Sequence, residues 1–148
     1  MPATYTTIVL HIVFSTKHRK PFLTDPLRKR LYHYMGGIIK KDQGKLYAIG
    51  GMPDHVHILL RWRPDVSLSD FLRTLKSRSS YWGHQTVPKH RLFGWQDGYA
   101  AFSVSQSQIR KVKRYIALQE EHHKKRDFQQ ELIALLKAHD VEYDERYI

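Results

Sequence analysis

The chain has 148 residues, 41% hydrophobic and 12% aromatic, with no cysteine and a net charge of +11 from 25 Lys and Arg against 14 Asp and Glu. This length predicts a single domain over residues 1–148, and the lack of cysteine excludes disulfides and Cys-ligated zinc. No apolar run approaches the roughly 20 residues of a membrane span, which predicts a cytoplasmic protein, and the excess of cations predicts nucleic acid as the partner.

The first 62 residues predict a strand, a helix and a β-hairpin. The first segment is rich in the β-branched and aromatic side chains that strands favour. A capping residue and a proline in segment 24–26 then indicate a helix start. Two later strands are separated by so short a turn that they should pair as a hairpin. We therefore expect a strand at 4–15, a helix at 27–41, and strands at 45–50 and 55–62.

The rest of the chain predicts a second helix, a fourth strand and further helices. These elements are a helix opened by Ser67 to Asp70, a loop at 88–98, a strand at 99–105, and helices at 106–124 and 128–138. The first six elements follow the order β-α-β-β-α-β, which predicts an α+β, ferredoxin-like antiparallel sheet with additional C-terminal helices. Two helices would cover one face of this sheet and leave the other face open.

The strand at 55–62 contains two histidines one residue apart, His55 and His57. Because alternate side chains of a strand point to opposite faces, Val56 and Ile58 share the core face and the two imidazoles share the other. Imidazoles at this spacing are close enough to hold one metal ion between them. The pair is therefore the candidate reaction centre.

The helix at 106–124 contains a tyrosine and a glutamine four residues apart, Tyr115 and Gln119, which should lie on one face. Basic side chains surround the tyrosine in sequence and are expected to favour its phenolate; they are Arg110, Lys111, Lys113 and Arg114. Attack of a phenolate on a phosphodiester would leave a covalent phosphotyrosine and release a hydroxyl. A metal opposite the tyrosine would neutralise the developing charge.

His55-Val56-His57 fits the His-hydrophobic-His signature of the HUH endonucleases. Together with Tyr115-x-x-x-Gln119 on a later helix, the chain resembles their single-tyrosine transposases, which serve simple insertion sequences or are domesticated near repetitive palindromes. The segments 11–19 and 115–123 also look like that family. The resemblance covers nearly the whole chain.

The resemblance implies a residue for each role. His55, His57 and the side-chain oxygen of Gln119 would be metal ligands, and Tyr115 would be the nucleophile. The family cleaves single-stranded DNA with Mg2+ or Mn2+, recognises DNA hairpins and works as a homodimer with composite sites, the histidines coming from one subunit and the tyrosine from the other. Two imidazoles intrinsically favour later transition metals over Mg2+.

Simpler interpretations stay open for each of these residues. The histidine pair is also compatible with polar surface, and Tyr115 with a ring packed on an amphipathic helix. His122 and His123 fit a helix C-terminus, where the dipole favours imidazolium, and His122 also shares the face of Tyr115. His11 either supports a site residue or is simply buried. Candidate phosphate contacts flanking the histidine strand in sequence are Arg19, Lys76 and Arg78.

Two other function classes compete with a transposase. The same element order underlies the RNA recognition motif, a non-catalytic module that stacks unpaired bases on aromatic side chains of its open face. This chain instead places His55 and His57 there. A metal-dependent hydrolase would need a general base near the metal, and the histidine strand offers only Asp54 beside it.

Overall fold

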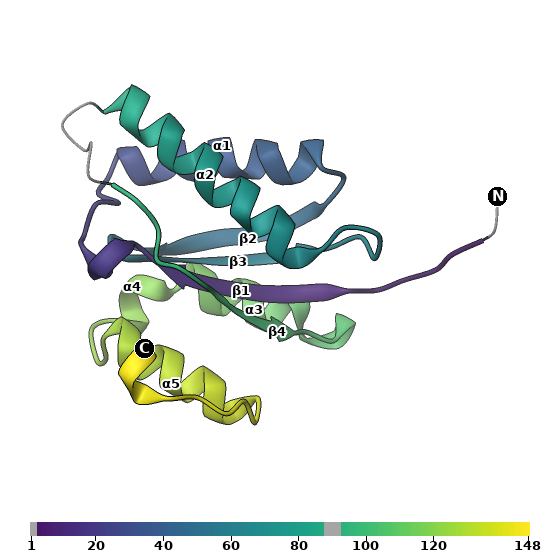
Figure 1. The fold of residues 1–148 in the computed structure, drawn as a ribbon. Coiled ribbons are helices and arrows are strands. Elements are labelled where there is room, and N and C mark those ends of the chain that lie inside the picture. Colours follow the sequence, from purple (N-terminus) through teal and green to yellow (C-terminus); the bar gives the residue numbers. More distant parts are fainter. Residues whose placement is uncertain (1–2, 88–92) are drawn as a thin grey trace.

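The computed structural model describes residues 3–87 and 93–148. It has three layers, with a sheet between one pair of helices and a C-terminal group of helices (Figure 1). The expected order β-α-β-β-α-β is confirmed. Its elements are β1 (Val9–Ser15), α1 (Leu27–Lys41), β2 (Lys45–Met52), β3 (His55–Arg61), α2 (Leu68–Thr86), β4 (Ala100–Ser103), α3 (Ile109–Ala117), α4 (Gln119–His122) and α5 (Phe128–Ala138).

The sheet has the strand order β2-β3-β1-β4, and every neighbouring pair is antiparallel. This is the ferredoxin-like arrangement that the sequence predicts. The two central strands, β1 and β3, come from distant parts of the chain, with Val13 opposite His57 and Ser15 opposite His55.

The main core lies between the sheet and the helices α1 and α2. Alternation along β3 places Val56, Ile58 and Leu60 on this side, as predicted, and all three are fully buried. The helices supply the opposing apolar side chains; these include Leu31, Met35, Phe71, Leu72 and Leu75. Ser67 caps α2 by accepting a hydrogen bond from the backbone of Asp70 at 3.3 Å, which satisfies one free amide of the first turn.

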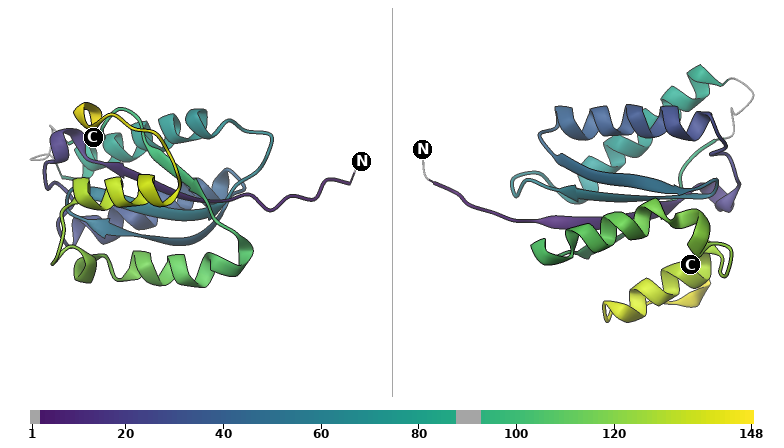
Figure 2. Two further views of the ribbon diagram at one scale, coloured as in Figure 1. Left: turned by 90° about the horizontal axis from the view of Figure 1, so that it is seen from below. Right: turned by 180° about the vertical axis from the view of Figure 1, so that it is seen from behind.

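The second face of the sheet is covered, and the prediction of an open face is wrong. Helices α3, α4 and α5 lie across it, as the views from below and behind show (Figure 2). Ile109 and Ile116 of α3 pack on Leu59, and Phe128 of α5 packs on Val13. The apolar stripes of α3 and α5 need this face of the sheet as a packing partner, because each helix would otherwise expose a large apolar area.

Gly50 on β2 lets α3 approach this face closely. A side-chain carbon at this position would lie 2.9 Å from the carbonyl oxygen of Ile116, closer than van der Waals contact allows. Gly50 pairs with His57 across the strands. The missing side chain thus brings the tyrosine helix down beside the histidines.

Several predicted boundaries differ from the structure. The first strand begins at Val9, the fourth covers only Ala100–Ser103, and the hairpin turn shrinks to two residues because β2 continues to Met52. The helix expected at 106–124 is broken at Leu118, whose backbone angles (φ −102°, ψ 26°) interrupt it between α3 and α4. Of the predicted loop 88–98, residues 88–92 lie outside the described part. None of the described helices combines the length and apolar character of a membrane span.

Candidate active site

The two histidines of β3 lie at the bottom of the second face of the sheet. Their side chains are fully buried beneath the C-terminal helices. Their ring centroids are 5.2 Å apart, because the i, i+2 spacing puts His55 and His57 on one face of the strand. The predicted pair therefore exists, but inside the protein rather than on an open surface.

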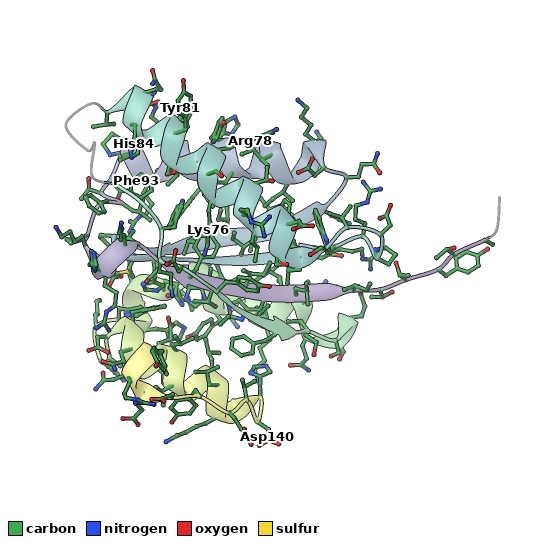
Figure 3. All side chains as sticks on the ribbon, in the orientation of Figure 1. Lys76, Arg78, Tyr81, His84, Phe93 and Asp140 are labelled. Atoms are coloured by element: carbon green, nitrogen blue, oxygen red, sulfur yellow. The ribbon has the colours of Figure 1, made fainter. Side chains whose placement is uncertain are left out.

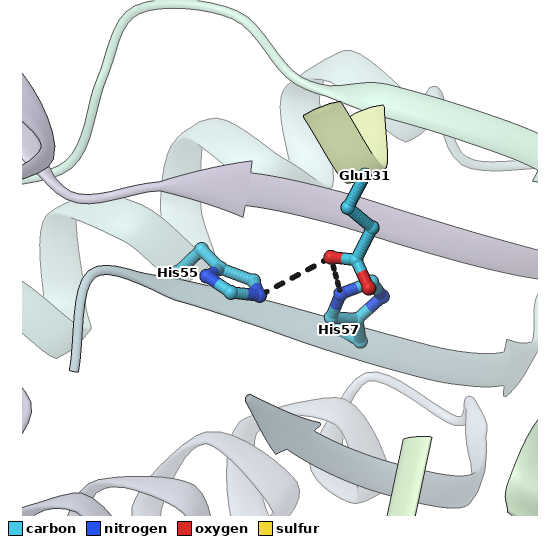
Figure 4. Close-up of side chains that lie close together, drawn as sticks. All are labelled: His55, His57 and Glu131. Atoms are coloured by element: carbon cyan, nitrogen blue, oxygen red, sulfur yellow. Dashed lines mark hydrogen bonds and ion pairs between the residues drawn. The ribbon is translucent and has the colours of Figure 1, made fainter. Parts of the chain in front are cut away.

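Glu131 of α5 reaches down between the histidines (Figure 4). Its Oε1 accepts a hydrogen bond from His57 Nε2 at 2.9 Å and lies 3.4 Å from His55 Nε2. The carboxylate is fully buried. The ligand atoms of His55, His57 and Glu131 all lie within 4.8 Å of one another, which is the spacing of a shared cation site.

Gln119, the first residue of α4, joins the same group of atoms. Its Oε1 accepts from His55 Nε2 at 3.0 Å, and its Nε2 donates to Glu131 Oε2 at 3.0 Å. The break at Leu118 does not separate it from the tyrosine helix, since α3 and α4 both contact β2. The structure thus brings three of the predicted site residues, His55, His57 and Gln119, into one centre.

Tyr115 of α3 completes the centre. Its hydroxyl donates to Glu131 Oε2, and its ring centroid lies 5.8 Å from that of His57. Burial, followed by the hydrogen bond to Glu131, raises the pKa of Tyr115. The expected lowering by neighbouring cations is wrong for this structure, because the four basic side chains of 110–114 are exposed to solvent while the carboxylate touches the phenol.

The pKa shifts at the centre favour an ionised carboxylate on Glu131 and a protonated ring on His55. Burial alone would lower the pKa of His55, but hydrogen bonds with Asp54 and Glu131 outweigh it and raise that pKa to about 9. Burial lowers the pKa of His57 despite the adjacent carboxylate. Burial would raise the pKa of Glu131, yet the bonds from both histidines hold it far below its ordinary range.

The donor set fits a divalent cation. Two imidazole Nε2 atoms, one carboxylate oxygen and one amide oxygen face a common point. Mixed nitrogen and oxygen ligands suit Mn2+ and later metals, whereas Mg2+ favours all-oxygen sites that retain waters. The buried Glu131 also supplies the negative charge that a cation site in a protein interior requires.

Three further histidines adjoin this centre. His11 of β1 is buried and its Nε2 lies 2.7 Å from His57 Nδ1, so it is both buried and in contact with a site residue. His122 stacks on the Tyr115 ring at 4.4 Å, in line with the supporting role considered for it. His123 directly follows α4, and its Nε2 lies 3.1 Å from Glu131 Oε1.

The comparison with known proteins decides the family. The family profile described as "Transposase IS200 like" matches residues 4–119. The chain belongs to the IS200-like transposases. The transposase is 27% identical over 114 residues to the ISDra2 transposase TnpA of Deinococcus radiodurans. The aligned segment covers 74% of this chain and 81% of that protein. The resemblance seen in the sequence is thereby confirmed.

Solved structures agree with this assignment. The transposase superposes on the crystal structure of a putative transposase from Deinococcus radiodurans R1 with a TM-score of 0.65 and 26% identity, over 80% of this chain and 96% of that one. A REP-associated tyrosine transposase bound to a REP hairpin gives a TM-score of 0.62 over 83% of this chain and 73% of that one. At 15% identity, the second likeness concerns the fold alone.

Glu131 is the site residue that sequence reasoning missed, and it also lies beyond the matched segment 4–119. A signal was present in the helix at 128–138. Glu131 follows Phe128 by three residues and precedes Leu135 by four, so it occupies the apolar stripe of an amphipathic helix. A carboxylate in such a stripe needs a buried partner.

The candidate phosphate contacts of the transposase are not gathered at this centre. Arg19 is exposed in the turn after β1. Lys76 and Arg78 lie on α2, across the sheet from the histidines (Figure 3). The Lys76 ammonium donates to the backbone carbonyls of Gln96 and Gly98, and burial lowers its pKa to about 8. Lys76 is therefore held by the protein itself, while Arg78 is exposed.

Proposed function

We propose that this transposase, acting as one domain over residues 1–148, cleaves and rejoins single-stranded DNA at element ends through a 5′-phosphotyrosine on Tyr115. One observation carries the proposal. A tyrosine hydroxyl, an amide and two imidazoles from three different elements converge on a single buried carboxylate, Glu131. A protein that only bound nucleic acid would have no use for such a centre away from its surface.

The proposed reaction follows from the groups present. Tyr115 Oη attacks the scissile phosphorus and the P–O3′ bond breaks, so the protein keeps the 5′-phosphate and a 3′-hydroxyl leaves. The phenolic proton passes to Glu131 Oε2, the acceptor to which the hydroxyl already donates, and the departing 3′ oxygen takes up a proton from water. Because the phosphotyrosine link conserves the energy of the phosphodiester, the 3′-hydroxyl of a second strand can reverse the step and join the ends.

A divalent ion, Mg2+ or Mn2+, would be held by His55, His57, Gln119 and Glu131. When bound there, the ion would supply positive charge next to the oxygens of the scissile phosphate. Gln119 was the only third ligand expected from the family resemblance. Glu131 adds an anionic oxygen that lies 2.9 Å from His57 Nε2 and 3.4 Å from His55 Nε2. The two imidazoles in this donor set favour Mn2+ over Mg2+.

DNA has to enter beside α5. His55, His57 and Glu131 are fully buried, so a phosphodiester reaches them only when α5 moves away from the sheet. A cleft of about 500 Å3 between α3 and α5 already reaches the ring of Tyr115 next to His11. We place the scissile nucleotide in this cleft and the following strand along its rim.

The substrate we propose is single-stranded DNA with hairpins, handled in the cytoplasm. The match to the IS200-like transposase family supports DNA as the substrate. The hairpins are part of the proposal, and a protein of the same fold has been solved bound to a REP hairpin. The covered second face of the sheet disfavours the RNA recognition motif as a reading of this fold, because that motif stacks bases on an open face.

Trapping a covalent adduct tests the proposal. A single-stranded oligonucleotide with a hairpin is labelled at its 3′ end and incubated with the protein and Mn2+, then run on a denaturing protein gel. We expect label to migrate with the protein, since the fragment downstream of the cut carries the 5′-phosphate joined to Tyr115. Cut DNA without adduct would indicate a hydrolase that uses water, and binding without cutting would indicate a non-catalytic module.

We also propose phosphate contacts at Arg19 and Arg78. Arg19→Gln and Arg78→Gln should each weaken binding to any single strand and lower the salt dependence of the affinity by about one phosphate. Lys76→Gln should change the salt slope less, because its ammonium is bound to carbonyls. Fluorescence anisotropy with a labelled oligonucleotide at four salt concentrations measures the slopes. An unchanged slope in Arg19→Gln and Arg78→Gln removes both from the binding surface.

We propose further that the transposase works as a homodimer with composite sites, as its family resemblance implies. In one chain Tyr115 already reaches the histidine centre, so exchange of α3 between subunits would keep the same contacts with a different partner. Mixing inactive Tyr115→Phe with inactive His57→Ala should then restore cleavage, because half of the centres in a mixed dimer carry neither change. Subunit exchange is verified first with differently tagged chains. Exchanged mixtures that stay inactive mean that each chain builds its own centre.

A further inference from the structure

We propose that Asp54 and His11 are positioning residues that turn the two histidines of the centre so that both Nε2 atoms face the metal. The inference rests on the proposed function, because it assumes that His55 and His57 hold the ion. It concerns two residues to which neither the family resemblance nor the cation cluster assigns a role, and it gives each of them one task.

An imidazole binds a metal through one nitrogen while the other carries a proton and needs an acceptor. In this centre the Nε2 atoms of His55 and His57 face Glu131, and both Nδ1 atoms face away from it. The Nδ1 atoms are therefore the ones that have to be held. Without a fixed acceptor, either ring could rotate about its Cβ–Cγ bond, and its Nε2 would no longer face the metal position.

Asp54 supplies the acceptor for His55. Its Oδ1 lies 2.7 Å from His55 Nδ1, a short, charge-assisted hydrogen bond. Asp54 is itself fixed, because its carbonyl accepts from the amide of Thr16 at 2.8 Å and from the Thr16 hydroxyl at 3.1 Å. The amide of Leu23 binds the preceding carbonyl of Pro53 at 2.9 Å. The two-residue turn is thus tied to the rest of the protein on both sides.

His11 supplies the acceptor for His57. Its Nε2 lies 2.7 Å from His57 Nδ1, and the two rings stack at 5.0 Å between centroids and 30° between planes. The register explains the contact: Val13 lies opposite His57, so His11 is the diagonal neighbour on the same face. When His57 Nε2 faces an ion, its Nδ1–H donates to His11 Nε2, which has a free lone pair in that tautomer.

Asp54 and His11 occupy the same position relative to their histidines, next to Nδ1, but they differ in chemistry and in burial. Asp54 comes from the turn before β3 and is partly exposed, whereas His11 is buried in β1. Each can therefore be changed without touching the other. If each residue acts as an acceptor, a replacement that places an uncharged acceptor atom near the same position should keep the function.

The experiment measures Mn2+ binding to the metal-free protein without DNA, by the electron paramagnetic resonance signal of free Mn2+. Asp54→Ala and His11→Phe remove the acceptor. Asp54→Asn keeps an oxygen acceptor at its position, and His11→Gln replaces the nitrogen acceptor of His11 by an amide oxygen. We expect the first two to weaken binding by about 10- to 100-fold and the second two by only a few-fold. Asp65→Ala is the control, because it removes an exposed carboxylate paired with Arg63. Thermal unfolding of every variant shows that it is folded.

Each outcome bears on the inference. Equal weakening by Asp54→Ala and Asp54→Asn means that charge, not aim, is what Asp54 contributes, and the positioning role is then wrong. Binding as tight as in the unaltered protein in both Asp54→Ala and His11→Phe also overturns it, while leaving the metal site itself intact. If the unaltered protein and His57→Ala bind Mn2+ equally weakly, the metal centre of the proposed function fails together with this inference. Should His11→Phe not fold, the Asp54 pair decides alone.

Discussion

Replacing Tyr115 by phenylalanine is expected to abolish the covalent adduct and to lower DNA cleavage by roughly four orders of magnitude or more. The substitution removes only the phenolic oxygen, which is the atom that would join the phosphate. Ring packing against His57 and His122 is retained, because those contacts involve the ring. Binding of a hairpin oligonucleotide should therefore stay close to that of the unaltered protein.

The stability of the variant has a definite expected direction. Loss of the hydroxyl leaves Glu131 with one donor fewer, although His57, Gln119 and His123 still bind its carboxylate. Leaving one buried acceptor position unfilled costs about 1–3 kcal/mol. Thermal unfolding should show a modest decrease and a single cooperative transition.

Tyr81→Phe is the matched control for this measurement. It removes the same oxygen from a tyrosine on α2 that is 66% exposed and lies across the sheet from the centre. Cleavage by Tyr81→Phe should equal that of the unaltered protein. A Tyr115→Phe protein that still forms an adduct would falsify the assignment of the nucleophile and direct attention to the remaining tyrosines.

The sequence predicted the sheet and its two faces because that information is local. Alternation in β3 places Val56 and Ile58 on one face and His55 and His57 on the other whatever packs against them. Turn length fixed the hairpin in the same way. Element ends were less well predicted, since the last residues of a strand depend on whether a neighbour continues to pair.

The covered face and Glu131 depend on long-range packing. Nothing within a few residues of His57 indicates that α5, 74 residues later, lies on top of it. The apolar stripes of α3 and α5 indicate that one face of each helix is buried, but they do not show which part of the protein covers that face. The acidic residue in the apolar stripe of 128–138, Glu131, needs a buried partner, and the two histidines of the strand were candidates for it.

The break at Leu118 shows the same limit at shorter range. A helical spacing of four residues predicts that Tyr115 and Gln119 share a face, and both do reach Glu131. They reach it from two helices rather than one, because the chain turns at Leu118 to follow the sheet into α4. Their proximity was therefore predicted correctly, although from a continuous helix that the structure does not have.

Replacing His57 by alanine is expected to have the second largest effect, the loss of metal binding and of metal-dependent cleavage. The change removes one of the two proposed nitrogen ligands and also leaves the buried Glu131 carboxylate without its 2.9 Å partner. We expect Mn2+ affinity to fall by more than roughly 100-fold, beyond the effect of losing an orienting partner. Gln119→Ala should cause a smaller loss, because water can replace a neutral oxygen ligand and Glu131 remains.

Titration of metal-free protein with Mn2+ gives the affinities, and the adduct assay with and without excess EDTA gives the activities. Since His57→Ala also opens a cavity in the second face of the sheet, the thermal unfolding of this variant is measured in parallel. His84→Ala is the matched histidine control, because the ring of His84 binds the Phe93 carbonyl far from the centre. Full-rate cleavage by the unaltered protein in excess EDTA would show that the buried histidines serve the fold, and the tyrosine would then have to act without a metal.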